Sequence, residues 1–222
     1  MKKKNISDCI KVMNIDTPEI MEYHVNIETS KDRQKYIEQI KKIIRTSKEY
    51  RDYIQFLKDH MNLDKCVFFQ NITSTKNQRG KVSIELHHEP FTLQDYVDVV
   101  LQKYLDEGTE LNALLIADEV LELHYENKVG LVPLSKTMHE VIHNSNKILV
   151  PLNMVYGEYS KFLEEYDPYI SDEMYDKLQS KIDMTNNLTA ESFDAIRKEF
   201  TYIDVKGFDT VSKMETTSSQ AV

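Results

Sequence analysis

The chain has 222 residues, and its five glycines and five prolines are too few for a sandwich or barrel built from many tight turns. Two distant cysteines, Cys9 and Cys66, exclude a disulfide framework and a cysteine-rich zinc ribbon, and they fit a reducing cytoplasm. The formal net charge of −9 opposes non-specific attraction to nucleic acid, and no segment approaches the roughly 18 apolar residues of a membrane span, so we expect no membrane partner.

The first part of the chain predicts one long helix between less regular stretches. Apolar residues at spacings of three and four make residues 30–60 an amphipathic helix, with lysines and arginines on its other face. Residues 1–29 are irregular, apart from a short strand predicted at 21–25. Downstream, residues 66–69 are typical of a buried strand, and residues 81–88 alternate in polarity, which predicts a second strand.

Two helices are predicted between that second strand and the next apolar segment. Thr92 can cap the first helix, which extends to about residue 106, because its valines and leucines share one stripe. Thr109 can cap the second helix, which runs through Val120. The sequence therefore predicts a helical insertion at about residues 92–122.

The last part of the chain is predicted to be helical after one short apolar segment. Residues 129–134 form a strand or turn, and Ser135 is a good N-cap for the helix that follows. Further helices are predicted at 156–166, 171–183 and 189–200. We expect four regions, namely a helical arm at 1–62, a core at 63–155, C-terminal helices at 156–210 and a disordered tail at 211–222.

Charge is spread unevenly along the chain. Basic residues outnumber acids at 31–58, whereas at 85–126 Lys103 is the only Lys or Arg. The predicted contacts to DNA are therefore residues of the first region, namely Lys41, Lys42, Arg45 and Lys48. The acidic region is expected to be a solvated face or a surface for a protein partner.

Four of the seven histidines fall in two tight pairs that predict one metal site. His139 and His143 are four residues apart, so on a helix they lie on one face and can bind one cation together. His87 and His88 end the predicted strand, where one can join the metal while the other faces water or substrate. The other three, His24, His60 and His124, are expected to be ordinary, although His124 is close enough in sequence to contribute to the same site.

Two blocks of sequence resemble the HNH (His-Me finger) endonucleases. Residues 86–90, Leu-His-His-Glu-Pro, resemble the family's first strand, where a metal-ligand His or Asp precedes the catalytic His. Residues 130–143 resemble its closing segment, where an apolar strand runs into a helix with one or two metal-binding histidines. The resemblance implies an α+β fold, with a small ββα-metal core, the helical insertion, and flanking N-terminal and C-terminal helices.

The same resemblance implies a role for each histidine of the two pairs. His88 corresponds to the general base that takes a proton from the attacking water. His87, His139 and His143 correspond to ligands of one divalent ion at the scissile phosphate of DNA. Mg²⁺ or Mn²⁺ is the expected ion, with Zn²⁺ or Ni²⁺ as alternatives.

One catalytic position of the family is replaced in this chain. By spacing, the central Asn that orients the base aligns with Gly130, and Asn127 lies three residues earlier, where it would substitute if the loop is bulged. The composition and the divergent motif are typical of a bacteriophage-encoded protein, which would act in the host-cell cytoplasm.

Two other functions remain open from the sequence. The missing Asn favours a catalytically inactive HNH-fold protein with a structural or regulatory role in a phage. Residues 139–143 also spell His-Glu-Val-Ile-His, the zinc metalloprotease signature, with Glu140 as base and Glu164 or Glu165 as third ligand. That interpretation leaves His87 and His88 unexplained.

Overall fold

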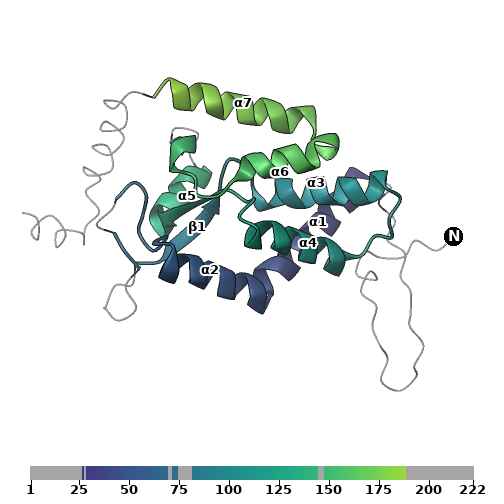
Figure 1. Ribbon diagram of the computed structural model, residues 1–222, viewed down its shortest axis with the longest axis horizontal. Helices are drawn as coiled ribbons and strands as arrows, with labels where there is room; N and C mark the ends of the chain where they lie inside the picture. The colour runs from purple at the N-terminus through teal and green to yellow at the C-terminus, as the bar shows by residue number, and fades with distance from the viewer. Residues whose placement is uncertain (1–26, 28, 70–71, 75–81, 145–147, 189–222) are drawn as a thin grey trace, which may run out of the picture. The chain divides into compact units, whose positions relative to one another are not determined.

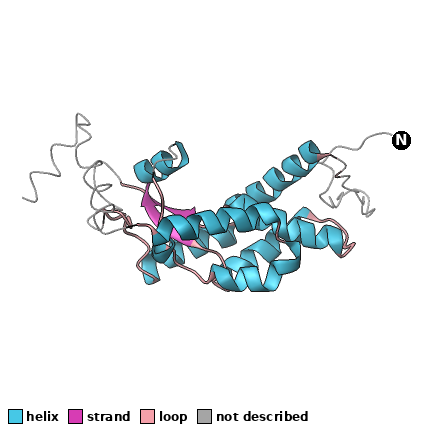
Figure 2. Cartoon of the chain, turned by 90° about the horizontal axis from the view of Figure 1, so that it is seen from above, coloured by secondary structure: helices cyan, strands magenta, loops and turns pink. Residues whose placement is uncertain are grey.

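A computed structural model describes residues 27, 29–69, 72–74, 82–144 and 148–188. The predicted strand at 21–25, the helix at 189–200 and the tail at 211–222 lie outside these residues. The described part contains helices and one two-stranded sheet (Figures 1 and 2), which confirms the predicted α+β class. Every described helix is too short or too polar to cross a membrane.

The long helix predicted at 30–60 is two helices, α1 (Ser30–Thr46) and α2 (Lys48–His60). Ser47 separates them in an extended conformation, with φ −62° and ψ 151°. Its hydroxyl accepts a hydrogen bond from the backbone N–H of Tyr50 at 3.1 Å, so this serine caps α2. The prediction of one helix is wrong because the apolar spacing continues across a residue that favours the extended cap conformation.

The helical insertion is present as α3 (Leu93–Asp106) and α4 (Ala113–Tyr125). Thr92 caps α3 as predicted, in a reciprocal capping box with Asp95. Helix α4 begins later than predicted. Its cap is Asn112, whose side-chain oxygen accepts from Leu114 N at 2.9 Å, whereas Thr109 N–H bonds back to Tyr104 O at the end of α3.

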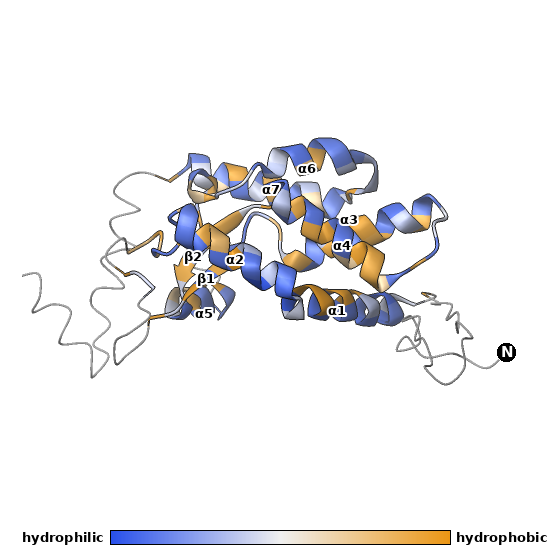
Figure 3. Ribbon diagram, turned by 60° about the horizontal axis from the view of Figure 1, so that its bottom comes forward, coloured by the Kyte–Doolittle hydropathy of each residue, from blue (hydrophilic) through white to orange (hydrophobic). Residues whose placement is uncertain are grey.

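One apolar core joins the first four helices to the C-terminal ones. Helix α1 packs on α3 and α4, and Figure 3 shows hydrophobic residues along α1 and α4. The same core includes Phe162 of α6 (Tyr159–Tyr166) and Leu178 of α7 (Asp172–Asn186). Two 3₁₀ turns, η2 (Leu152–Met154) and η3 (Asp167–Tyr169), flank α6.

The sheet consists of β1 (Ile84–His88) and β2 (Leu131–Ser135), paired antiparallel with His87 opposite Val132. Helix α5 (Lys136–Asn144) follows β2 directly and packs on both strands. Ser135 caps it as predicted, because its hydroxyl accepts from Met138 N at 3.3 Å.

The strand predicted at 66–69 is absent from the described residues, although Cys66 and Phe68 are buried as expected. Cys66 N–H bonds to Ile72 O at 2.9 Å, and Val67 N–H bonds to Pro133 O of β2 at 2.9 Å. The chain therefore turns back after a few residues instead of extending along the sheet.

Helix α7 is held to the core by two lysine ion pairs that differ in burial. Lys181 pairs with Glu89, whose side chain is 5% exposed, and Lys177 pairs with Asp95, whose side chain is 26% exposed. Losing one partner of a buried pair leaves an uncompensated charge, which costs about 3–5 kcal/mol. We expect Lys181→Met to lower the free energy of unfolding by about 3 kcal/mol or more, and the matched Lys177→Met to lower it by less than about 1 kcal/mol. Urea denaturation of both variants checks this prediction, and equal losses would contradict it.

Candidate metal centre

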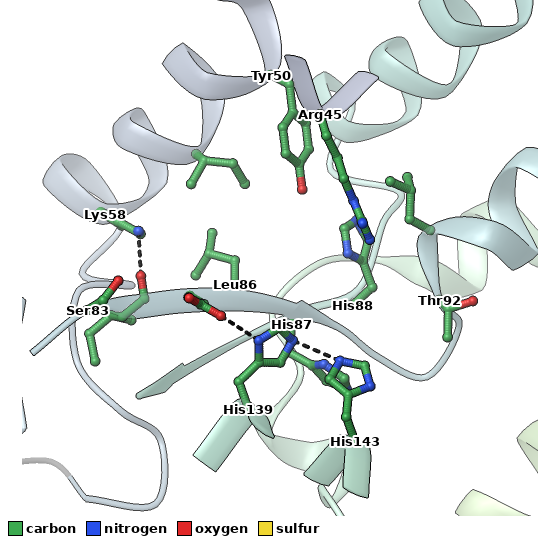
Figure 4. A pocket seen from close by; sticks show the side chains of 14 residues that line it. Arg45, Tyr50, Lys58, Ser83, Leu86, His87, His88, Thr92, His139 and His143 are labelled. Carbon is green, nitrogen blue, oxygen red and sulfur yellow. Dashed lines mark hydrogen bonds and ion pairs between the residues drawn. The ribbon is translucent and has the colours of Figure 1, made fainter. Parts of the chain in front are cut away.

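Three histidines from two elements converge beside the sheet. Each of His87, His139 and His143 offers one ring nitrogen, and these nitrogens all lie within 4.8 Å of one another. His87 comes from β1, and the other two come from one face of α5, one helical turn apart (Figure 4). The structure thus brings together the three residues that the sequence predicts as metal ligands.

The geometry of the pair on α5 suits a shared ion. His139 Nε2 and His143 Nε2 are 3.0 Å apart. Two nitrogens bound tetrahedrally to one Zn²⁺ at about 2.0–2.1 Å would be about 3.3 Å apart, so little movement would be needed. Burial, followed by the neighbouring His139, lowers the pKa of His143 and favours the neutral ring that a metal ion requires.

Each of two ligand rings is oriented by a carboxylate. His139 Nδ1 lies 2.6 Å from Glu85 Oε2, which leaves its Nε2 to face the cluster. His87 Nε2 lies 3.5 Å from Glu89 Oε2. Burial alone would raise the pKa of Glu89, but the contacts with His87 and Lys181 outweigh it and hold that pKa below its usual value. Carboxylate partners of this kind fix ring orientation and increase ligand basicity in metal sites.

The remaining nitrogen of His87 is the strongest indication that these residues bind a ligand. His87 is 6% exposed, and its Nδ1 atom is buried with no hydrogen-bond partner among the described residues. A buried polar atom without a partner costs free energy. The residues therefore fit a divalent ion, and a set of imidazole nitrogens suits Zn²⁺ or Ni²⁺ better than the Mg²⁺ or Mn²⁺ expected from the sequence.

The cluster borders a cavity of about 570 Å³ between the sheet and the first two helices. Two cations, Arg45 and Lys58, line it on the helical side (Figure 4). Lys58 Nζ donates to Ile84 O at 2.6 Å, and burial lowers its pKa. Within the part of the chain that the structure describes, the Arg45 side chain makes no hydrogen bond or ion pair. Its guanidinium is therefore free to bind an anion in this cavity.

Of the four residues predicted to contact DNA, only Arg45 lines this cavity. Lys41 pairs with Glu38 at 2.7 Å, and Lys48 pairs with Asp52 within α2. Lys42 is exposed. Contact between these four residues and DNA stays a prediction.

His88 lies on the opposite side of β1 from the three clustered histidines (Figure 4). Its Nε2 is 3.1 Å from Nε2 of His124, a buried residue of α4. Burial, and then the neighbouring His124, hold the pKa of His88 well below its usual value. His88 still lines the cavity with the cluster, so the structure puts it near the site but in contact with a different histidine.

Asn127 is not brought to the cavity. It occupies the turn after α4 with φ 60°, and its backbone oxygen accepts from Glu158 N at 2.7 Å. Its side-chain oxygen is buried without a partner among the described residues. A catalytic role for Asn127 stays a prediction that no contact with His88 supports.

Gly130 leaves no room for the Asn that the resemblance expects there. A Cβ at this position would lie 1.9 Å from Glu89 O. The backbone is held in place because Gly130 N donates to Tyr96 Oη at 3.1 Å and Gly130 O accepts from Glu89 N at 3.0 Å. The close approach of two backbone segments therefore explains the glycine.

The third possible ligand of the cluster is a nitrogen of His87, whereas a zinc protease of this signature would use a carboxylate oxygen of Glu164 or Glu165. Glu165 pairs with Lys128, and neither Glu164 nor Glu165 lines the cavity. This placement weighs against the His-Glu-Val-Ile-His interpretation.

Several acids of the region 85–126 make internal contacts in the structure. Asp98 pairs with Arg33 at 2.7 Å, and Glu119 pairs with Lys103 at 2.9 Å. Fewer carboxylates are therefore available to a protein partner than the sequence suggests, and the partner surface stays a prediction.

Sequence reasoning missed Glu85 and Glu89, and it noted His124 only for its proximity. A usable signal existed for the two carboxylates, because they stand two residues before and two after His87 in the sequence. The contact of His124 with His88 depends on how α4 packs, and local sequence carries no sign of it.

Searches of curated proteins and of solved structures find no match to this chain. A family model described as Bacteriophage G278-like virion protein matches residues 2–207, and no HNH nuclease family matches. The predicted phage origin is therefore supported. Because the match covers most of the sequence, the chain belongs to the Bacteriophage G278-like virion protein family.

Proposed function

We propose that this virion protein binds one divalent transition-metal ion at His87, His139 and His143 and hydrolyses DNA phosphodiester bonds by HNH-type chemistry. In this proposal β1, β2 and α5 form a ββα-metal core, and α3 and α4 are the insertion between its strands. One observation carries the proposal. The three imidazoles converge beside a cavity that also holds His88 and a free arginine, Arg45.

In this proposal each side chain has a separate role. A bound ion would supply a Lewis acid for the phosphoryl and leaving oxygens. Glu85 and Glu89 hold the rings of His139 and His87 for that ion. Arg45 binds the phosphate as a planar cation, and His88 takes the proton of the attacking water.

A structural metal site is the second candidate, and two observations favour it. His88 lies across β1 from the ligands, and Gly130 excludes the family's Asn. In that case the ion would hold β1 to α5 in a virion protein without catalytic activity, because structural metal sites contribute directly to folding.

Plasmid nicking separates the two candidates. Purified protein is incubated with supercoiled DNA and Mg²⁺, Mn²⁺, Ni²⁺ or Zn²⁺, and the wild type is compared with His88→Ala, His139→Ala and a control, His60→Ala. His60 is exposed and stands outside the cluster. We expect cleavage by the wild type and the control, and a loss of at least about a hundredfold in both site variants. Metal bound by the wild type without cleavage under any ion would refute the enzyme and support the structural site.

A further inference from the structure

His124 is a buried histidine that the proposed chemistry does not yet use. It is 0% exposed on α4, and the rings of Tyr50 and Tyr53 contact it edge-on at centroid distances of 5.5 and 5.7 Å. Its two nitrogens have one partner each. Nδ1 is 2.7 Å from Val120 O, and Nε2 is 3.1 Å from Nε2 of His88.

These two contacts determine which nitrogens carry hydrogen. A backbone carbonyl can only accept, so His124 Nδ1 must be the donor to Val120 O. Burial lowers the pKa of His124 to about 4, so the ring is neutral near pH 7 and its Nε2 has no hydrogen. That Nε2 must then accept, and the hydrogen between the two rings belongs to His88 Nε2.

We infer that His124 is a positioning residue that holds His88 in the tautomer with hydrogen on Nε2 and a bare Nδ1. A neutral imidazole has one donor nitrogen and one acceptor nitrogen, and the partner of one determines the state of the other. A residue of α4, in the insertion, thus determines which nitrogen of His88 on β1 carries hydrogen.

The consequence for catalysis rests on the proposed function. His88 Nδ1 takes a proton from water while the water oxygen forms a bond to phosphorus. The phosphorus–ester oxygen bond breaks, and solvent protonates the leaving oxygen. His88 becomes an imidazolium that still donates Nε2–H to His124, so the base gains charge without losing its orientation.

Nitrogen NMR of the ¹⁵N-labelled full chain tests the tautomer without any need for activity. We expect the hydrogen of His88 on Nε2 and a scalar coupling between Nε2 of His88 and Nε2 of His124 across the hydrogen bond. Both signals should be unchanged in His60→Phe and lost in His124→Phe. A hydrogen on Nδ1 of His88 in the wild type would overturn the inference even if no variant folds.

A kinetic readout separates positioning from mere stability. If the wild type cleaves DNA, His124→Phe should lower kcat at least about tenfold with KM and metal stoichiometry unchanged, and His124→Gln, whose amide oxygen can accept from His88, should recover most of the loss. Equal kcat in the wild type and His124→Phe would contradict the role. Coupling observed without any cleavage would leave the tautomer established and refute only the proposed function.

Discussion

Replacing His139 by Ala is expected to weaken Zn²⁺ binding by more than about a hundredfold, because loss of an outer partner alone costs about 10–100-fold in such sites. His139 contacts both a second histidine of the cluster and a carboxylate. It lies 3.0 Å from His143 through Nε2, and Glu85 fixes its other nitrogen at 2.6 Å. Competition with a chromophoric chelator gives the dissociation constant, and the wild type should bind one ion per chain.

Two further variants make this measurement decisive. His87→Ala should weaken binding as strongly as His139→Ala, because it removes the buried ligand from β1. His60→Ala should leave the dissociation constant unchanged. Binding that is insensitive to His87→Ala would contradict the three-histidine site. It would favour the interpretation of residues 139–143 as a zinc metalloprotease signature.

Gly130→Ala is expected to lower the free energy of unfolding by about 3 kcal/mol or more. The added Cβ would overlap the carbonyl oxygen of Glu89, a backbone atom that no side-chain rotation can move away. The same shift would disturb Glu89, which contacts the ligand His87, so Zn²⁺ affinity should fall as well. Urea denaturation and the chelator competition measure the two effects.

Gly108 provides the matched control. It has φ +64° and nothing within 4 Å of an added Cβ, so alanine there costs only the left-handed backbone conformation, about 1–2 kcal/mol. Similar losses for Gly130→Ala and Gly108→Ala would show that the segments at 89 and 130 can separate.

Gly130→Asn should fail to restore the missing catalytic amide, because its Cβ would make the same overlap with Glu89 O.

The parts of the structure that follow from local chemistry could be predicted from the sequence. The capping box of Thr92 and the cap by Ser135 depend on residues three positions apart. The meeting of His139 and His143 depends on one helical turn. That His87 joins them, and not its neighbour His88, could be predicted only through the family resemblance, because the pattern of pairs does not choose between two adjacent residues at the end of a strand.

The features that the sequence did not predict depend on one local signal that outweighs another, or on tertiary packing. Ser47 ends a helix whose apolar pattern continues, because one hydroxyl cap outweighs periodicity at that residue. Residues 66–69 are apolar enough for a strand, but Val67 finds its partner in Pro133 and Cys66 in Ile72. The contact between His88 and His124 requires α4 to be in place, so the side of β1 that His88 faces could not be decided from alternation alone.

The insertion between the two strands of the sheet has a consequence for the order in which we expect the molecule to fold. Strands β1 and β2 are joined through residues 89–130, which contain both α3 and α4, so they are not a hairpin that a short turn can close. Closing a long loop costs entropy before any strand contact offsets it, whereas helices form from local contacts within about a microsecond. We therefore expect α3 and α4 to form first and shorten the loop, the strands to pair afterwards, and the three histidines to meet last. Tight metal binding is consequently a property of the fully folded chain, and its binding free energy adds to the stability of that state alone.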